Sequence, residues 1–408
     1  MKNKLNIGLF GFGCVGGGLY EVLNKSELLN ANISKICIKD PNKKRSIPAE
    51  NFTVIKEDLL YDNEINLIVE LIDDADAAFE IVVEAFKQGK NVVSANKKLI
   101  ANHFNELKEL SEEYGVSFIY EAAVCGSIPI IRNLEEYYNN DSISAIQGIC
   151  NGTTNYILTR LVEEGKPFAE ILKNAQELGF AESDPTLDIE GFDSQFKLQI
   201  LLAHAFGVSI KPELILRLGI TKLLPQDIQF AKEKGYRIRL ISRGEKINNN
   251  EITGLVTPHF VDETEATFGV NYEFNAVTVQ GLFADKQLFQ GKGAGSYPTA
   301  SAVLSDVSAV QYDYAYEWRK LVSSKLKFTT EIAVKVYVST QNYLSFDALE
   351  FIDISESFVG DGYAYRIGYV NFNTLKAITE NSALSLILFN EPLQKIENYQ
   401  EKKNLAYV

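Results

Sequence analysis

The chain has 408 residues, more than the roughly 250 to 300 that a single hydrophobic core normally organises, so two or three domains are expected. Its hydrophobic content of 46% and charged content of 23% are typical of a globular protein that buries a large core. A net charge of −14 at pH 7 argues against nucleic-acid and anionic membrane partners, because both surfaces repel an acidic chain at long range.

The cysteines also indicate the class of protein. Cys14, Cys37, Cys125 and Cys150 form no CxxC pair or metal-binding spacing and lie in apolar or glycine-rich surroundings. This favours reduced thiols in a cytoplasmic protein, most of them small buried side chains. No apolar run reaches the roughly 18 to 20 residues that a membrane span requires, and the N-terminus has the pattern of a first strand rather than of an export signal.

Strand and helix patterns alternate over the first 128 residues. Short apolar runs predict buried strands, and apolar residues at helical spacing predict helices between them. The predicted strands are 5–10, 33–40, 65–72, 91–96 and 116–124, and the predicted helices are 17–29, 75–90 and 103–115. This alternation predicts a parallel, doubly wound sheet of the α/β class.

The segment GFGCVG lies between the first predicted strand and the first predicted helix, with Gly11, Gly13 and Gly16 in GxGxxG register. The first glycine permits a tight turn, the second lets the backbone approach a pyrophosphate, and the third allows close helix packing. The phosphates would then lie at the positive end of the helix. We therefore expect a Rossmann dinucleotide-binding domain over 1–128; a purely structural glycine turn is the alternative. The cofactor-binding residues expected in this loop are Gly11, Phe12, Gly13, Cys14, Val15 and Gly16.

The end of the second strand bears on the choice between NAD and NADP. An acidic residue about 20 positions after the loop binds the ribose hydroxyls of NAD, whereas a cation there suits the 2′-phosphate of NADP. Here Lys39 and Asp40 are followed by Lys43, Lys44 and Arg45. The pattern favours NADP and leaves NAD open, and a solvated basic turn is the alternative interpretation.

From about residue 130 the pattern changes to α+β. The helix 192–206 is expected to stop at Gly207. The other predicted elements are helices at 131–139, 155–164 and 168–178, a strand at 142–150, strand-like runs over 236–290 and a helix after Pro298.

These patterns predict a chain of several parts. Beyond the dinucleotide-binding domain we expect a middle region formed by 129–150 and 299–325, a catalytic substrate-binding domain over 151–298 and a small C-terminal α+β domain over 330–408.

The segment GFAESDPTLDIEGFDSQFKL gathers five carboxylates ahead of Lys197. A helix that begins near Phe192 places Asp193 and Lys197 one turn apart on one face. Apolar neighbours would partly desolvate the lysine and lower its pKa, so that it could act as an acid or base near neutral pH. An ordinary surface ion pair is the alternative.

Six motifs, in chain order, resemble those of the homoserine dehydrogenase family. They are GLFGFGCVGGGL, VVSANKKLIA, YEAAVCGSIPII, GICNGTTNYIL, AESDPTLDIEGFDSQFKL and GKGAGSYPTASAVLSDV, and together they cover about residues 5–325. The resemblance implies an oxidoreductase that interconverts L-homoserine and L-aspartate 4-semialdehyde with NAD(P), in threonine and methionine biosynthesis.

The same resemblance implies roles for individual residues. Glu182 and Asp188 would bind the amino group of the substrate, and Asp193 would orient its reacting end. Lys197 would transfer a proton as hydride moves to or from the nicotinamide. Lys97 of SANK would be a second lysine beside cofactor and substrate, and which lysine carries the proton stays open.

Further family features concern the surroundings of this site. Gly152, Thr153 and Thr154 would line the substrate and nicotinamide region, and the loop from Gly293 to Gly295 would lie against the cofactor. The middle region would form a homodimer or a higher homo-oligomer. The resemblance also implies a monovalent-cation site, for sodium, built by Glu121, Val124, Gly126 and Ile128, partly through main-chain carbonyls.

The shortest family members end near residue 325, so residues 330–408 are an addition. Their pattern is strand, short helix, strand, strand, helix, strand, which is the order of the regulatory ACT domain of longer members. No acidic-x-x-Gly-x-Leu ligand motif follows the first strand, so feedback inhibition by threonine stays an open question.

One rival hypothesis is a different enzyme. ICNGTTN resembles the cysteine loop of semialdehyde and glyceraldehyde-phosphate dehydrogenases, in which a thiolate attacks the aldehyde. Cys150 would then be the nucleophile. Against this, Asn151 and Gly152 separate the thiol from Thr153, and no histidine lies in a recognisable base motif.

A second rival is a dinucleotide sensor without catalysis, whose C-terminal part binds a partner or an amino acid. Sensing requires no pair of amines, so the presence of Lys97, Asp193 and Lys197 argues against it.

Overall fold

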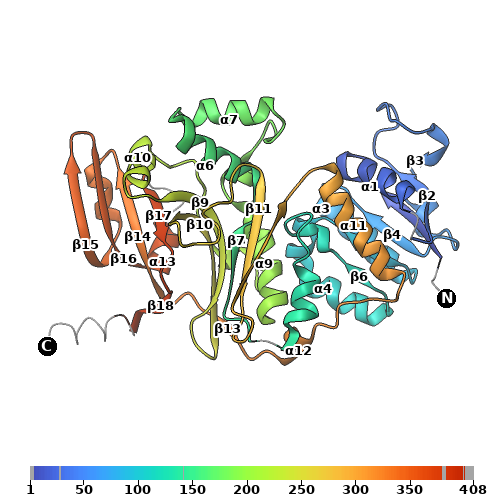
Figure 1. The fold of residues 1–408 in the computed structure, drawn as a ribbon. Helices are drawn as coiled ribbons and strands as arrows, with labels where there is room; N and C mark the ends of the chain where they lie inside the picture. The colour runs from blue at the N-terminus through green and yellow to red at the C-terminus, as the bar shows by residue number, and fades with distance from the viewer. Residues whose placement is uncertain (1–3, 27–28, 141, 379–382, 398, 400–408) are drawn as a thin grey trace. The chain divides into compact units, whose positions relative to one another are not determined.

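The computed structural model describes residues 4–26, 29–140, 142–378, 383–397 and 399. The chain divides into two compact units (Figure 1). The first consists of Met1–Asn139 and Gly291–Val322, and the second of Asn140–Gln290 and Ser323–Val408. No helix in the described part of the chain is both long and apolar enough to span a membrane.

The first unit is built on a parallel sheet. Its strands are β1 (Leu5–Phe10), β2 (Ala31–Cys37), β3 (Phe52–Thr53), β4 (Leu67–Glu70), β5 (Asn91–Ser94) and β6 (Phe118–Ile119). Its helices are α1 (Cys14–Lys25), η1 (Ala49–Asn51), α2 (Glu57–Leu60), α3 (Ala75–Lys87), α4 (Lys97–Tyr114), η2 (Glu121–Ala123), α5 (Ile131–Glu135), η3 (Tyr137–Asn140), α11 (Ser296–Val310) and α12 (Arg319–Ser323), the last residues of η3 and α12 lying beyond the unit.

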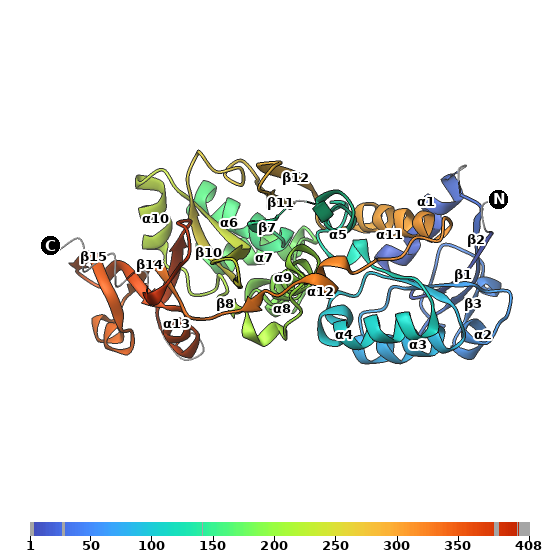
Figure 2. The same ribbon diagram turned by 90° about the horizontal axis from the view of Figure 1, so that it is seen from below.

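The strands lie in the order β3-β2-β1-β4-β5-β6, so the sequence direction reverses between β1 and β4. This is the order of a doubly wound sheet, and the prediction of that fold is confirmed. Figure 2 shows α1 and α11 on one face of the sheet and α2, α3 and α4 on the other. Because both faces are covered, β4 has every residue buried.

The helix predicted at 103–115 is the second part of α4, because a kink at His103 separates it from a helical segment that begins at Lys97. That segment begins with a helix cap: the Asn96 Oδ1 accepts a hydrogen bond from the Leu99 amide at 3.0 Å. The cap fixes Lys97 as the first residue of α4, directly after the carboxyl end of β5.

The second unit combines helices with a large mixed sheet. Its first part contains β7 (Ala145–Ile149), α6 (Gly152–Glu164), α7 (Phe168–Glu177), α8 (Thr186–Ile189), α9 (Phe192–Phe206), η4 (Pro212–Leu214), β8 (Leu216–Arg217), α10 (Pro225–Glu233), β9 (Arg237–Lys246), β10 (Glu251–Val261), β11 (Phe274–Gln280) and β12 (Lys286–Lys292), the end of β12 from Gly291 lying in the first unit. The C-terminal part contains β13 (Lys327–Phe328), β14 (Ile332–Thr340), η5 (Tyr343–Ala348), β15 (Phe351–Gly360), β16 (Tyr363–Asn371), α13 (Phe372–Ile378), β17 (Ser385–Phe389) and β18 (Gln394–Lys395).

Helix α9 packs directly on this sheet. A Cβ atom added at Gly244 of β9 would come within 2.4 Å of Leu202 of α9, so glycine is what allows the helix to approach the strand so closely. Nearly every residue of α9 is buried as a result. Its predicted end is confirmed, because Gly207 follows with a φ of 67°.

The C-terminal part has the predicted element order from β14 to β17, with the short strand β18 in addition, and the four strands β14 to β17 lie in the order β17-β14-β16-β15. Strand β17 also pairs in parallel with β10, with His259 opposite Leu388. Among the described residues, one sheet of twelve strands therefore runs through both parts of the unit.

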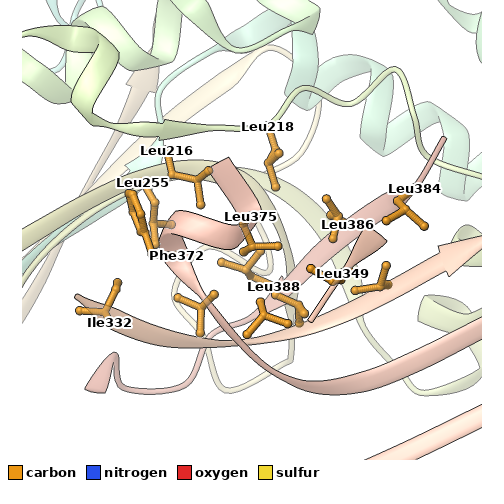
Figure 3. Close-up of a cluster of buried hydrophobic side chains, with 14 of the residues drawn as sticks. Leu216, Leu218, Leu255, Ile332, Leu349, Phe372, Leu375, Leu384, Leu386 and Leu388 are labelled. Carbon is orange, nitrogen blue, oxygen red and sulfur yellow. The ribbon is translucent and has the colours of Figure 1, made fainter. Parts of the chain in front are cut away.

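A shared apolar core lies beside this junction (Figure 3). Leu216, Leu218 and Leu255 come from β8, the residue after it and β10, and they pack with Leu375 of α13 and Leu388 of β17. All five side chains are buried. The C-terminal part is thus joined to the rest of its unit by burial of apolar surface as well as by strand pairing.

Leu375→Ala is expected to lower the free energy of unfolding by about 2 to 5 kcal/mol, because a buried leucine truncated to alanine leaves a cavity. Leu344→Ala is the matched control, since that side chain is 72% exposed and a change below about 0.5 kcal/mol is expected. Urea unfolding followed by circular dichroism measures both. Equal stability of the two variants would contradict this packing.

Candidate active site

The glycine-rich loop has the geometry that a dinucleotide requires. Gly11 has a φ of 93°, and a Cβ there would lie 2.5 Å from the Leu71 carbonyl oxygen. A Cβ at Gly16 would lie 2.3 Å from the Gly11 carbonyl oxygen, so the turn closes tightly on the helix. Gly13 is the N-cap residue of α1. Unlike Gly11 and Gly16, it has open space where a Cβ atom would be. That space and the helix N-terminus fit a pyrophosphate.

Two further predicted segments approach this loop within the first unit. The Ser296 hydroxyl donates a hydrogen bond to the Cys14 carbonyl at 2.8 Å, which joins the start of α11 to the start of α1. A Cβ at Gly126 would lie 2.7 Å from the Gly293 carbonyl oxygen, so the backbones of these two segments touch. The structure thus brings together three motifs that lie far apart in the sequence.

Lys39 and Asp40 follow β2 and are exposed. The Asp40 carboxylate accepts a hydrogen bond from the Asn42 amide at 2.9 Å, and the Arg45 guanidinium donates to the Asp40 carbonyl at 2.8 Å. Arg45 also lies over the ring of Phe52, at 5.2 Å. The basic turn is therefore folded back on itself beside the carboxyl end of the strand.

A network of polar groups in the first unit positions the start of α4, where Lys97 lies. Glu70, at the end of β4, accepts hydrogen bonds from the Ile72 amide at 2.7 Å and from the Ser94 hydroxyl at 2.6 Å. Burial raises the pKa of Glu70 to about 7. The Ser94 hydroxyl in turn accepts from the Asn96 amide, and Asn96 caps the helix that Lys97 begins.

The predicted cation loop is also in the first unit. The carboxylate of Glu121 is buried and accepts hydrogen bonds from the backbone amides of Ile131 and Arg132, at 2.7 and 2.9 Å. Burial raises its pKa. Cys125 and Gly126 both have a positive φ, 56° and 54°, so the loop bends sharply there. In the described part of the chain no group of three or more His, Cys, Asp or Glu side chains could hold a metal.

The second unit holds the buried lysine. The Lys197 ammonium donates to the Asp193 carboxylate and to the Cys150 carbonyl, each at 2.7 Å. Both side chains of the pair are buried within α9, with 9% and 4% of their surface exposed. A buried charge requires this kind of partner, so the interpretation as an ordinary surface ion pair is excluded.

A residue that the sequence did not single out completes the cluster. The Asn151 amide donates to the Asp188 carboxylate at 2.7 Å and to the Asp193 carboxylate at 2.9 Å. Its carbonyl oxygen caps α6 by accepting from the Thr154 amide at 2.8 Å. Asparagine directly before a helix is a recognisable N-cap signal, but its two donor contacts depend on the tertiary fold.

The electrostatics of the cluster follow from burial. Burial and the charge of Asp193 raise the pKa of Asp188, and the hydrogen bond from Asn151 and the charge of Lys197 oppose that rise. The pair of carboxylates therefore forms a partly desolvated negative site, which suits the ammonium group of a small molecule.

Of the other predicted site residues, Gly152 and Thr153 lie beside this cluster, because Gly152 follows Asn151 and the Thr153 hydroxyl faces Asp188, whereas in the described part of the chain Glu182 makes no contact with it. Glu182 is exposed, and among the described residues none makes a hydrogen bond or an ion pair with its carboxylate. Gly152 begins α6, and the Thr153 hydroxyl donates to the Phe180 carbonyl at 2.7 Å. Lys97 belongs to the first unit, whereas Lys197 and its acidic partners belong to the second.

A doubly wound sheet with a GxGxxG loop defines an NAD(P)-binding protein, and a buried lysine paired with carboxylates gives it the groups of an acid-base catalyst. The profile of the homoserine dehydrogenase NAD-binding domain matches residues 11–121, and that of the homoserine dehydrogenase domain matches residues 129–308. The chain belongs to the homoserine dehydrogenase family, whose members are NAD(P)-dependent oxidoreductases.

Individual proteins that resemble this chain in sequence or structure are also homoserine dehydrogenases. The homoserine dehydrogenase of Bacillus subtilis is 38% identical over 315 residues, which are 75% of this chain and 72% of the relative. The crystal structure of a homoserine dehydrogenase from Thiobacillus denitrificans covers 95% of this chain and 98% of its own, with a TM-score of 0.81 and 31% identity. A hyperthermophilic archaeal homoserine dehydrogenase in complex with NADPH covers 77% of this chain and 99% of its own, with a TM-score of 0.66 and 26% identity.

Gly13→Ala is expected to weaken NADPH binding by about tenfold or more, because the added methyl group takes the space at the helix N-terminus that a phosphate needs. Gly17→Ala is the matched control: it also has open space, and alanine inside a helix does not disturb the fold. Fluorescence titration with NADPH measures both dissociation constants. Equal affinities for the two variants would place the phosphates elsewhere.

Proposed function

We propose that the protein interconverts L-homoserine and L-aspartate 4-semialdehyde, with Lys197 as the proton-transfer group. The observation that carries this proposal is the buried cluster of Lys197, Asp193, Asn151 and Asp188. An amino-acid substrate presents an ammonium group, for which carboxylates are the natural partners, and the alcohol-to-aldehyde step requires one amine within reach of the oxygen.

In this proposal the first unit binds the dinucleotide, and the second unit supplies the proton-transfer group. The dinucleotide, when bound, donates the hydride to the aldehyde carbon or accepts it from the alcohol carbon. In the reductive direction the Lys197 ammonium gives a proton to the aldehyde oxygen, and in the oxidative direction its amine removes the proton from the hydroxyl. Asp193 orients Lys197 and balances its charge.

Asp188 and Glu182 bind the ammonium of the substrate in this proposal, and Gly152 and Thr153 line the pocket. Lys97, at the start of α4, acts beside the cofactor. Glu182 lies in the segment between α7 and α8, where its exposed side chain is available to a ligand. These roles follow the family motifs and the chemistry of an amino-acid substrate.

The cofactor is NADP in preference to NAD. The exposed Lys39 and the neighbouring Arg45 beyond β2 support this, since cations there suit a 2′-phosphate. The archaeal relative bound to NADPH supports it as well. Oxidation of NADPH against NADH with aspartate 4-semialdehyde measures the preference directly.

Three further features complete the proposal. A sodium ion binds at the loop of Glu121, Val124, Gly126 and Ile128, supported by the sharp bend at Cys125 and Gly126. The protein works in the cytoplasm, and it is a homodimer or a higher homo-oligomer. The C-terminal part is an ACT-like domain, supported by its alternating elements and the strand order β17-β14-β16-β15.

Lys197→Ala is expected to lower kcat by about 10²- to 10⁴-fold, because an acid-base group typically contributes that much. The dissociation constant for NADPH should stay unchanged. Lys173→Ala is the control, since that lysine is 77% exposed and pairs with Glu177 on the surface of α7. Steady-state turnover of homoserine with NADP⁺ gives the comparison. A kcat near that of the wild type would rule out this role for Lys197.

Substrate binding is expected to weaken as the pH falls. Protonation of Asp188 removes the negative charge that holds the substrate ammonium, and its raised pKa moves this loss to a higher pH than the ordinary value near 4. KM for homoserine should therefore rise on the acidic side, and Asp188→Asn should have a high KM with less pH dependence. Initial rates measured between pH 4 and pH 9 provide the profile. The same acidic limb in Asp188→Asn would assign the titration to another group.

A further inference from the structure

Asn151 joins three elements of the second unit. It lies between β7 and α6 and is 5% exposed. One hydrogen of its amide group goes to Asp188 of α8, and the other goes to Asp193 of α9. Its side-chain oxygen caps α6 by accepting hydrogen bonds from the backbone amide and the hydroxyl of Thr154. Every polar atom of the side chain is used, so its orientation is fixed from three directions.

A neutral donor is what this position requires. Two neighbouring carboxylates repel each other, and hydrogen-bond donors are needed to hold them side by side. When both are ionised, Asp188, Asp193 and Lys197 carry a net charge of −1, which complements the ammonium of an amino acid. A lysine or arginine in place of Asn151 would cancel that charge, whereas an amide orients the carboxylates and leaves it intact.

The same amide restrains the lysine. The Asp193 Oδ2 atom accepts from both Asn151 and Lys197, so these two donors share one oxygen. Lys197 donates in addition to the carbonyl of Cys150, the residue just before Asn151. Asn151, Asp193, Lys197 and Cys150 thus form a closed ring of contacts, and loss of the amide would remove one of the two donors that hold the Asp193 Oδ2 atom.

We propose that Asn151 is a positioning residue of the reaction: its amide holds the Asp188 and Asp193 carboxylates in the arrangement that receives the substrate ammonium and steers Lys197. This inference rests on the proposed function and deepens it. Asn151 itself transfers no proton, since an amide does not titrate in the working pH range.

Two substitutions separate this role from the capping of α6. Asn151→Ser and Asn151→Asp both keep an oxygen that can cap the helix, because serine and aspartate are as good at an N-cap as asparagine. Serine has one hydrogen to donate instead of two, and an ionised aspartate has none. We expect kcat/KM for homoserine to fall by about 10- to 100-fold in Asn151→Ser and further in Asn151→Asp, with NADPH affinity unchanged.

The pH profile provides the second readout. The groups that face Asp188 are Asp193 and Lys197 of α9, with Asn151 and the Thr153 hydroxyl from the start of α6. The amide favours the ionised carboxylates, so its loss should move the acidic limb of kcat/KM to higher pH in Asn151→Ser. A merely structural role would lower the melting temperature of the variant and leave that limb where it is in the wild type.

The control is Asn342→Ser, which replaces an exposed asparagine that caps η5 in the same unit. It should keep wild-type activity and the wild-type pH profile. Asn151→Ser with wild-type kcat/KM and an unmoved acidic limb would overturn the inference and leave the proposed function standing. Absence of homoserine turnover in the wild-type protein would overturn the proposed function itself, so the two failures are distinguishable.

Discussion

The burial of one ammonium group sets the constraints on the second unit. A charge removed from water costs several kcal/mol unless partners replace its hydration, and Lys197 has such partners in Asp193 and the Cys150 carbonyl. To supply them, the end of β7 must lie against the face of α9 that carries the lysine. Gly191, with a φ of 83°, turns the chain between α8 and α9 and so separates the two carboxylates onto different helices. Asn151 then ties those helices together.

The main constraint on the first unit is the close approach of backbone segments to one another. The turn at Gly11 and the contact between Gly126 and Gly293 require positions without a side chain, and they bring the cofactor loop, the 121–128 segment and the start of α11 to one region. Buried acids support this region: Glu121 accepts from the start of α5, and Asp306 of α11 accepts from the Glu121 amide at 2.8 Å. The second unit thus depends on a buried polar cluster, and the first on close approach of backbone segments.

Much of the fold could be predicted from the sequence wherever the signal is local. The alternation up to residue 128, the glycine register and the stop of α9 at Gly207 depend on neighbouring residues, and the structure has them, although the strand predicted at 116–124 is only β6 and gives way to η2. The two hydrogen bonds that the Asn151 amide donates could not be predicted, because their acceptors lie 37 and 42 residues away in the sequence. Helix α10 was missed as well, since its nine residues begin at Pro225 within a stretch of mixed pattern. The parallel pairing of β10 with β17 joins segments more than a hundred residues apart, and no periodicity signals it.

The junction at β10 and β17 limits how the chain can be shortened. Without the residues after 325, the end of β10 would lose its parallel neighbour and present unpaired amide and carbonyl groups at a sheet edge. Leu216, Leu218 and Leu255 would face water at the same time. A minimal catalytic chain cut from this protein would therefore need polar replacements at those three leucines and a protected edge on β10. The residues after 325 are therefore a structural part of this unit.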